Sequence, residues 1–383
     1  MEQLLNCQIA KKCNSCQLNN LSYSEQINYK HSKCRKYLGS YCRVQPVIAM
    51  QNPFSYRNKA QAVFKRERDK TIVWGLYKST TNTIVKTKEC KLHTKHSNEI
   101  FNSLCALFKS FKIQPYDPFR GTGFVKSVVV REGFSTNEVM VIINGADPVF
   151  PAKKTFTSAL LKKHPYITTV VTTVNKDAKK LFIGKTQDIL FGDGYIKDVL
   201  CGKTFLISPQ SFYQINPIQT EKLYSKAIEL AKLNSTQTVL DSYCGVGTIG
   251  ICASESAKLA LSVESNKDAI ADAKKNAKLN NIENIRFVCA DAKDYIKALK
   301  EDNTKIDVAF VDPPRMGCSN EFLQSIVDME IETIVYVSCN VETQARDIRM
   351  LKKHGYNVEH IQPVDMFPHT NHVECICLLT KTN

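Results

Sequence analysis

The chain has 383 residues, a length that predicts two or three domains. Hydrophobic residues make up 43% and charged residues 23%, which excludes wholesale disorder, and no apolar run is long enough to span a membrane. The first residues contain no apolar segment of the kind found in secretory signals, so we expect a cytoplasmic protein. In a reducing compartment, 15 cysteines indicate free thiols, metal ligands or catalysis rather than a disulfide framework.

The net charge of +15 is carried by the first half of the chain. Residues 1–200 contain 32 Lys and Arg against 14 Asp and Glu, whereas residues 201–383 contain 20 against 23. A solvated basic surface can serve solubility alone. Concentration in one half favours a polyanionic partner, most often nucleic acid.

The first half is predicted to be rich in strands after a short cysteine-rich segment. A helical pattern occupies residues 22–38, and a second helix is expected at 97–111. Between turn residues, β-branched or alternating runs predict strands at residues 58–69, 70–80, 123–132, 138–146 and 166–176.

After Gly202 the pattern changes to alternating strands and helices. Asn216 and Pro217 provide the cap and first turn of a helix. Short apolar strands then alternate with helical patterns, the strands lying at 236–243, 259–264, 285–291, 306–312 and 333–338. We therefore predict an α/β protein with a cysteine-containing, β-rich domain at 1–205 and a doubly wound, Rossmann-like domain at 206–383.

A glycine-rich turn and two acids indicate a nucleotide site in the second half. The first strand runs into the segment 244–250, whose glycines allow close backbone approach to a ligand. Glu264 ends the next strand, where an acid can bond a ribose diol, and Asp291 follows the third strand. A nicotinamide dehydrogenase or a plain strand-to-helix turn would show the same features.

Three reactive groups follow later strands. The fourth strand ends at Asp312-Pro313-Pro314-Arg315 and the fifth at Ser338-Cys339-Asn340, while Glu374 precedes a last apolar run. The carboxyl ends of parallel strands meet in one crevice, so we expect these groups to converge. Separately, each can be a turn residue, a small core cysteine or an exposed carboxylate.

These motifs, together with residues 211–216 and 372–374, resemble the RNA uracil-5-methyltransferase family, which makes 5-methyluridine with S-adenosylmethionine. The resemblance covers nearly the whole chain. Cys7, Cys13, Cys16 and Cys90 are similar in spacing to the iron–sulfur branch that acts on 23S ribosomal RNA. Many relatives begin with a small RNA-binding β-barrel, and this sequence starts too close to Cys7 for us to expect one.

The resemblance implies a covalent mechanism. Cys339 would be the nucleophile that adds to carbon 6 of uracil, with a pKa depressed by Arg315. Glu374 would be the base that removes the proton from carbon 5, with a pKa raised by burial. The implied cofactor-binding residues are Gln214, Tyr243, Thr248, Glu264, Asp291 and Asp312, and Asp312 can also serve the uracil.

Cys7, Cys13, Cys16 and Cys90 can bind an iron–sulfur cluster, a zinc ion or nothing, since four thiolates suit either metal centre. The resemblance favours a [4Fe-4S] cluster with a structural or RNA-positioning role. Cys34 or Cys42 could replace one of the four ligands.

We therefore predict a monomeric enzyme that methylates a uridine of 23S rRNA, with a tRNA uridine as the alternative substrate. A non-catalytic RNA-binding module would not need Cys339 and Glu374 together. Phe212 and Tyr213 are expected either to stack on a base or to belong to the core. The basic strip Lys59, Lys65, Arg66 and Arg68 is predicted to contact RNA phosphates.

Overall fold

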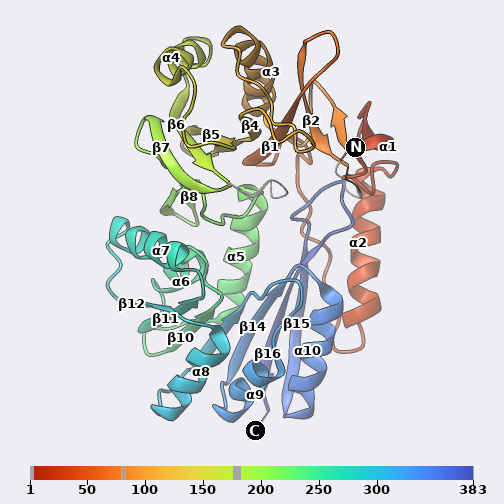
Figure 1. The fold of residues 1–383 in the computed structure, drawn as a ribbon. Helices are drawn as coiled ribbons and strands as arrows, with labels where there is room; N and C mark the ends of the chain where they lie inside the picture. The colour runs from red at the N-terminus through yellow and green to blue at the C-terminus, as the bar shows by residue number, and fades with distance from the viewer. Residues whose placement is uncertain (1–3, 79–80, 82, 176–182, 383) are drawn as a thin grey trace.

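The computed structural model describes residues 4–78, 81, 83–175 and 183–382. Figure 1 shows two lobes, an upper lobe formed by β1–β7 with α3 and α4, and a lower lobe formed by β10–β16 with α5–α10. The last residues of two predicted strands, 79–80 and 176, lie outside the described residues.

The upper lobe is built on a seven-stranded sheet in the order β3-β2-β1-β4-β5-β6-β7. All neighbouring strands run antiparallel except β5 and β6, which are parallel. The strands are β1 (Lys59–Arg66), β2 (Ile72–Tyr77), β3 (Ile84–Lys86), β4 (Val125–Glu132), β5 (Val139–Gly145), β6 (Ile167–Val174) and β7 (Lys185–Phe191).

Two helices pack on the upper sheet. The predicted helix at 97–111 is confirmed as α3 (Lys95–Ser110), which is capped by the Thr94 side chain. We predicted only this helix among the strands, but α4 (Lys153–Lys163) connects β5 to β6. Parallel strands require such a crossover, and Phe156 and Leu160 bury the apolar side of the helix.

A small hairpin, β8 (Ile196–Leu200) and β9 (Lys203–Ile207), lies between the lobes. It is fastened to the lower lobe by two amide side chains. The Leu206 N–H donates to Asn276 Oδ1 over 2.7 Å and the Thr204 N–H donates to Asn280 Oδ1 over 2.9 Å.

The lower sheet confirms the predicted Rossmann-like α/β fold. Its order is β12-β11-β10-β13-β14-β16-β15, and β16 runs antiparallel to the other six strands. The strands are β10 (Thr238–Ser242), β11 (Leu259–Glu264), β12 (Ile285–Cys289), β13 (Val308–Val311), β14 (Thr333–Ser338), β15 (Tyr356–Val364) and β16 (Glu374–Lys381). The helices are α5 (Pro217–Ala231), α6 (Thr248–Ala253), α7 (Lys267–Leu279), α8 (Ala292–Glu301), α9 (Asn320–Asp328) and α10 (Val341–Lys353).

The N-terminal segment packs on the lower lobe, although we grouped it with the first half. After the short helix α1 (Ala10–Cys13), α2 (Tyr23–Leu38) runs beside α10 and β15, as Figure 1 shows. Cys34 and Leu38 are fully buried in the core of the lower lobe. The chain then bridges to β15 at Val44–Ile361.

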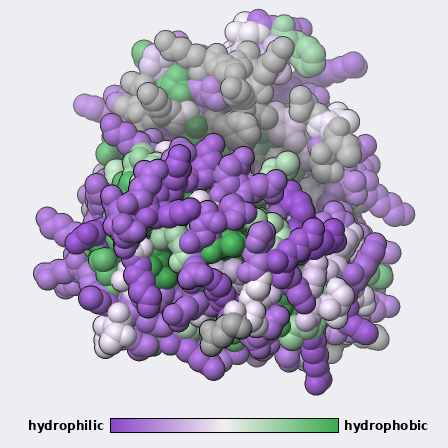
Figure 2. Space-filling view, turned by 90° about the horizontal axis from the view of Figure 1, so that it is seen from below, coloured by the Kyte–Doolittle hydropathy of each residue, from purple (hydrophilic) through white to green (hydrophobic). Residues whose placement is uncertain are grey.

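Seen from below, the molecule presents mostly hydrophilic side chains, with hydrophobic ones in small scattered patches (Figure 2). None of the helices in the described part of the chain is long and apolar enough to cross a membrane.

Candidate active site

The turn after β10 has the backbone geometry of a ligand-binding loop. The N–H groups of Tyr243 and Cys244 both donate to the Val263 carbonyl oxygen, over 3.0 and 2.9 Å. Gly247 has a φ of 83°, and a Cβ there would lie 2.9 Å from the Phe287 ring. Gly245 also has a positive φ, and no atom would lie within 4 Å of an added Cβ. Its backbone therefore faces open space that a ligand can fill.

Glu264, at the end of β11, holds this turn in place. One carboxylate oxygen accepts from the Asn266 N–H over 2.8 Å, and the other accepts from the Gly245 N–H over 3.3 Å. Asp291 lies outside the turn. It is exposed and caps α8 by accepting from the Lys293 N–H over 3.0 Å.

A pocket opens between this turn and the segment that precedes α5. Four of the six predicted cofactor-binding residues line it, namely Gln214, Tyr243, Thr248 and Asp312. Glu264 adjoins the pocket through its bond to Gly245, whereas Asp291 is not among the lining residues.

Two acids, Asp312 in the lining of the pocket and Asp241 of β10, have pKa values near neutrality. Burial raises the pKa of Asp312 to about 7. Burial also raises the pKa of Asp241 to about 7, although Asp241 accepts from the Gly250 N–H over 2.8 Å. We did not predict Asp241 from the sequence; its position just before the glycine-rich turn was the available signal.

The loops that carry Arg315 and Cys339 are bonded to each other. Asn340 Nδ2 and Thr343 Oγ1 both donate to the Arg315 carbonyl oxygen, over 3.1 and 3.2 Å. Ser338 Oγ accepts from the Asn340 N–H over 3.1 Å and thereby fixes the end of β14. The Arg315 side chain interacts with the Cys339 thiol.

The structure overturns the expected sign of the Cys339 pKa shift. Arg315 lowers the pKa as predicted, but burial and the nearby Glu374 carboxylate together raise it to about 11. Burial, Glu374 and, more weakly, Asp312 disfavour the thiolate and together outweigh the single cation. For Glu374, which is 4% exposed, burial and Asp312 raise the pKa well above its usual range, the direction that we predicted.

In the segment before α5, the side chains of the adjacent residues Phe212 and Tyr213 differ in their exposure to solvent. Arg131 is buried, and its Nη1 donates to the carbonyl oxygens of Ser208 and Ser211, each over 2.8 Å. Tyr213 is buried in the core, whereas the Phe212 side chain is 68% exposed. Of the two aromatic residues, only Phe212 is thus available to a base. Sequence patterns gave no signal for Arg131.

A second, larger cavity of about 780 Å³ adjoins the first through Phe212, Tyr213 and Gln214. Arg57 and Lys59 line it, which makes the cavity basic. Burial and Arg131 lower the pKa of Lys59 to about 8.

Cys7, Cys13, Cys16 and Cys90 all line this larger cavity. Burial and the other three thiols raise the pKa of Cys16 to about 12, and Arg57 opposes that shift. In the described part of the chain, however, no three Cys, His, Asp or Glu side chains are arranged as they would be around a metal ion. The thiols are therefore gathered in one cavity without ligand geometry.

The two rival ligands lie elsewhere. Cys34 is fully buried in the lower core, and Cys42 contacts the Glu359 carbonyl oxygen.

Comparisons with known proteins show to which family the chain belongs. The family model described as tRNA (uracil-5-)-methyltransferase matches residues 175–382, more than half of the chain. The chain belongs to this family. An uncharacterized RNA methyltransferase of Caldanaerobacter subterraneus subsp. tengcongensis is 39% identical over 381 residues, which cover 98% of this chain and 84% of that protein. One from Clostridium tetani is 37% identical over 378 residues, which cover 98% and 82%.

A solved structure of a family member is also similar. The Pyrococcus abyssi tRNA (uracil-54, C5)-methyltransferase in complex with S-adenosyl-L-homocysteine has a TM-score of 0.80 and is 30% identical. The match covers 95% of this chain and 85% of that one. The chain is therefore an S-adenosylmethionine-dependent RNA methyltransferase.

Proposed function

We propose that this methyltransferase transfers a methyl group to carbon 5 of a uridine through a covalent adduct with Cys339. The observation that carries the proposal is the meeting of Cys339, Arg315 and Glu374 with Asp312, beside the pocket lined by Gln214, Tyr243 and Thr248. A thiol, a cation and a buried carboxylate are the groups that methylation of a pyrimidine carbon requires.

Carbon 5 of uracil is a poor nucleophile until a thiolate adds to carbon 6. The Cys339 thiol loses its proton to solvent, its sulfur forms a bond to carbon 6, and the electrons of the 5,6 double bond move onto the carbonyl oxygen as an enolate. Carbon 5 then attacks the methyl group of S-adenosylmethionine, and S-adenosylhomocysteine leaves. Glu374 takes the proton from carbon 5, the double bond re-forms, and the Cys339 thiolate is expelled.

The remaining acids have supporting roles. Asp312, with a pKa of about 7, can hold a proton near neutral pH and hydrogen-bond the polar edge of the uracil. Gln214, Tyr243 and Thr248 bind the cofactor and Glu264 binds its ribose. Asp291, the sixth proposed cofactor residue beside Asp312, does not line the pocket.

The RNA enters through the larger cavity. The target base must leave its stack, at a cost of about a few kcal/mol, and the exposed Phe212 ring offers a new stacking surface. Arg57 and Lys59 supply positive charge along the same cavity. Residues 1–205 would thus bind most of the RNA while residues 206–383 perform the chemistry.

We further propose that Cys7, Cys13, Cys16 and Cys90 hold a [4Fe-4S] cluster. Their common cavity and the adjacent Arg57, which offsets thiolate charge, support it. Methyl transfer is not a redox reaction and needs no electron carrier, so the cluster would stabilise the segment around it. The chemistry of the site would not depend on it.

The cysteines favour 23S rRNA as the substrate, since the iron–sulfur branch that they resemble mostly acts there, although some members of that branch use tRNA. Similarity to the Pyrococcus abyssi enzyme, named for uracil-54 of tRNA, favours tRNA as the second candidate. Mapping 5-methyluridine in both RNAs from a deletion strain distinguishes them. Loss from 23S rRNA that the wild-type gene restores and Cys339→Ala does not supports the first, and loss from tRNA supports the second. Unchanged 5-methyluridine in both RNAs would contradict the proposal.

A further inference from the structure

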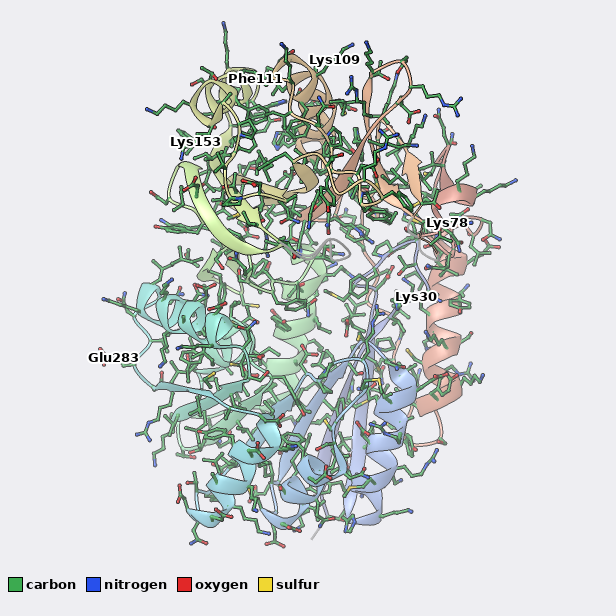
Figure 3. All side chains as sticks on the ribbon, in the orientation of Figure 1. Lys30, Lys78, Lys109, Phe111, Lys153 and Glu283 are labelled. Carbon is green, nitrogen blue, oxygen red and sulfur yellow. The ribbon has the colours of Figure 1, made fainter. Side chains whose placement is uncertain are left out.

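The segment 365–373, which leads from β15 into Glu374, is held mainly by residues near the N-terminus. Lys30 of α2 and Asp365 are both fully buried, and Lys30 Nζ lies 2.5 Å from Asp365 Oδ1. Lys30 Nζ also donates to the Phe367 carbonyl oxygen over 2.9 Å. Figure 3 shows Lys30 on the inner side of α2, toward the C-terminal strands. One ammonium group thus fixes two points of the segment.

A second residue of α2 completes the contact with Asp365. The Tyr23 hydroxyl donates to Asp365 Oδ2 over 2.8 Å, and it accepts from the Met50 N–H over 2.8 Å. Both oxygens of the Asp365 carboxylate are therefore occupied. A buried carboxylate with this many partners has one well-defined position.

His369, in the middle of the segment, is held in the same way. Its backbone N–H donates to Gln26 Oε1 over 2.8 Å, and its carbonyl oxygen accepts from the Leu18 N–H over 3.0 Å. Its ring accepts at Nδ1 from Gln26 Nε2 and donates from Nε2 to the Pro53 carbonyl oxygen, over 3.2 and 3.1 Å. Burial lowers the pKa of His369 to about 4, so the ring stays neutral with this single tautomer.

The position of Glu374 depends on the segment 365–373, which precedes it directly. It is the first residue of β16, it pairs with Val364 of β15, and residues 365–373 form the loop between those two positions. A displacement of the loop by about 1 Å would move the carboxyl group off the line to carbon 5, and such displacements cost about 100-fold in rate.

We propose that Lys30, with Asp365, is a positioning residue for the base Glu374. It touches neither substrate nor cofactor; it fixes the loop that places the carboxyl group opposite Cys339. The proposal rests on the proposed roles of Cys339 and Glu374. According to this proposal, α2 supports the step that follows methyl transfer, in which Glu374 removes the proton from carbon 5.

The covalent adduct provides a readout that a general folding defect would not move in the same way. In Lys30→Met, Cys339 should still attack RNA containing 5-fluorouridine at close to the wild-type rate. On ordinary uridine RNA, the methylated adduct should accumulate, because removal of the carbon 5 proton is slow. Turnover should fall about 10- to 100-fold. The matched control is Lys36→Met, an exposed lysine of the same helix, which should behave as wild type.

Lys30→Met leaves Asp365 buried without its cation, which can prevent folding, so the double variant Lys30→Met/Asp365→Asn is measured beside it. The double variant buries no unpaired charge and should accumulate the same adduct, with wild-type affinity for S-adenosylmethionine by titration calorimetry. If turnover and attack on 5-fluorouridine RNA fall together, or if neither changes, Lys30 does not position the base. If the wild type itself forms no 5-fluorouridine adduct, the proposed function fails instead.

Discussion

Cys339 directly follows Ser338 of β14 and Glu374 directly precedes Cys375 of β16, and Ser338 and Cys375 are the last pair of these antiparallel strands, so the register continued by one residue sets Cys339 opposite Glu374. Opposed residues of an antiparallel pair point to the same face of the sheet. The register of β14 and β16 therefore brings the thiol and the carboxyl group to one side of the crevice. This closeness lets the Glu374 carboxylate raise the pKa of Cys339.

Cys339→Ala should abolish methyl transfer and leave the affinity for S-adenosylmethionine unchanged, because the thiol attacks the base and does not line the cofactor pocket. Wild-type enzyme should form a covalent complex with 5-fluorouridine RNA, whose fluorine cannot leave as a proton, and the variant should form none. Denaturing electrophoresis detects the complex, with Cys105→Ala as the control. Methylation by Cys339→Ala would contradict the mechanism.

Glu374→Gln should form the adduct but break it down slowly, because an amide cannot accept the proton from carbon 5. Loss of a positioned base lowers turnover by about 100-fold or more. Single-turnover assays with ordinary RNA should show methylated RNA still bound to the enzyme. A normal turnover rate would assign proton removal to another residue or to water.

The pKa of about 11 for Cys339 predicts how its alkylation depends on pH in the free enzyme. A thiol with a raised pKa is almost entirely protonated at pH 7, so the rate of modification by iodoacetamide should rise about tenfold per pH unit between pH 7 and 9. Mass spectrometry of the Cys339 peptide measures that rate.

The two charged neighbours of Cys339 should shift this rate in opposite directions. Arg315→Met removes a cation that lowers the thiol pKa, so alkylation should slow at each pH; Glu374→Gln removes an anion that raises it, so alkylation should accelerate. Rates equal to that of the wild type in both variants would show that neither Arg315 nor Glu374 sets the pKa of Cys339.

The lower lobe was predictable from sequence because its strands are short, apolar and end in distinctive motifs. Residues near strand ends, such as Asp312 and Cys339, fall into one crevice whenever parallel strands form. The Cys339 pKa was not predictable, since it depends first on burial in the folded crevice and then on the closeness of Glu374, 35 residues away. The packing of α2 on the lower lobe was also not predictable from the sequence, because the residues around Lys30 do not indicate that its partner is Asp365, 335 residues further along the chain.

The cysteines predict a brown protein when it is purified without oxygen, containing iron and inorganic sulfide. Cys13→Ser and Cys90→Ser should lose the colour, whereas Cys42→Ser, outside the cavity, should keep it. Because the pKa of the unliganded Cys16 thiol is raised to about 12, cluster reconstitution should also release protons. Zinc in place of iron in the anaerobic protein would contradict the cluster.

The residues of the basic strip that lie on β1, namely Lys59, Lys65 and Arg66, should contribute to RNA binding through one face of the strand only. Lys59 lines the larger cavity and Lys65 follows on the same face by alternation, whereas Arg66 donates to Gln114 on the other. Lys59→Gln/Lys65→Gln should weaken RNA binding and flatten the slope of log affinity against log salt, by about 0.7 to 0.9 for each phosphate that is no longer neutralised. Affinity for S-adenosylmethionine should not change.

Filter binding across a salt series measures that slope, with Lys274→Gln/Lys278→Gln as the matched control. Both control lysines are exposed on α7 of the lower lobe, where residues 201–383 carry no excess of positive charge, and that pair should leave the slope as it is. Lys59→Gln/Lys65→Gln removes the same formal charge as the control variant. A general effect of net charge on RNA binding would therefore flatten both slopes equally. Equal slopes for the two variants would therefore mean that Lys59 and Lys65 only solvate the sheet and that RNA is held elsewhere.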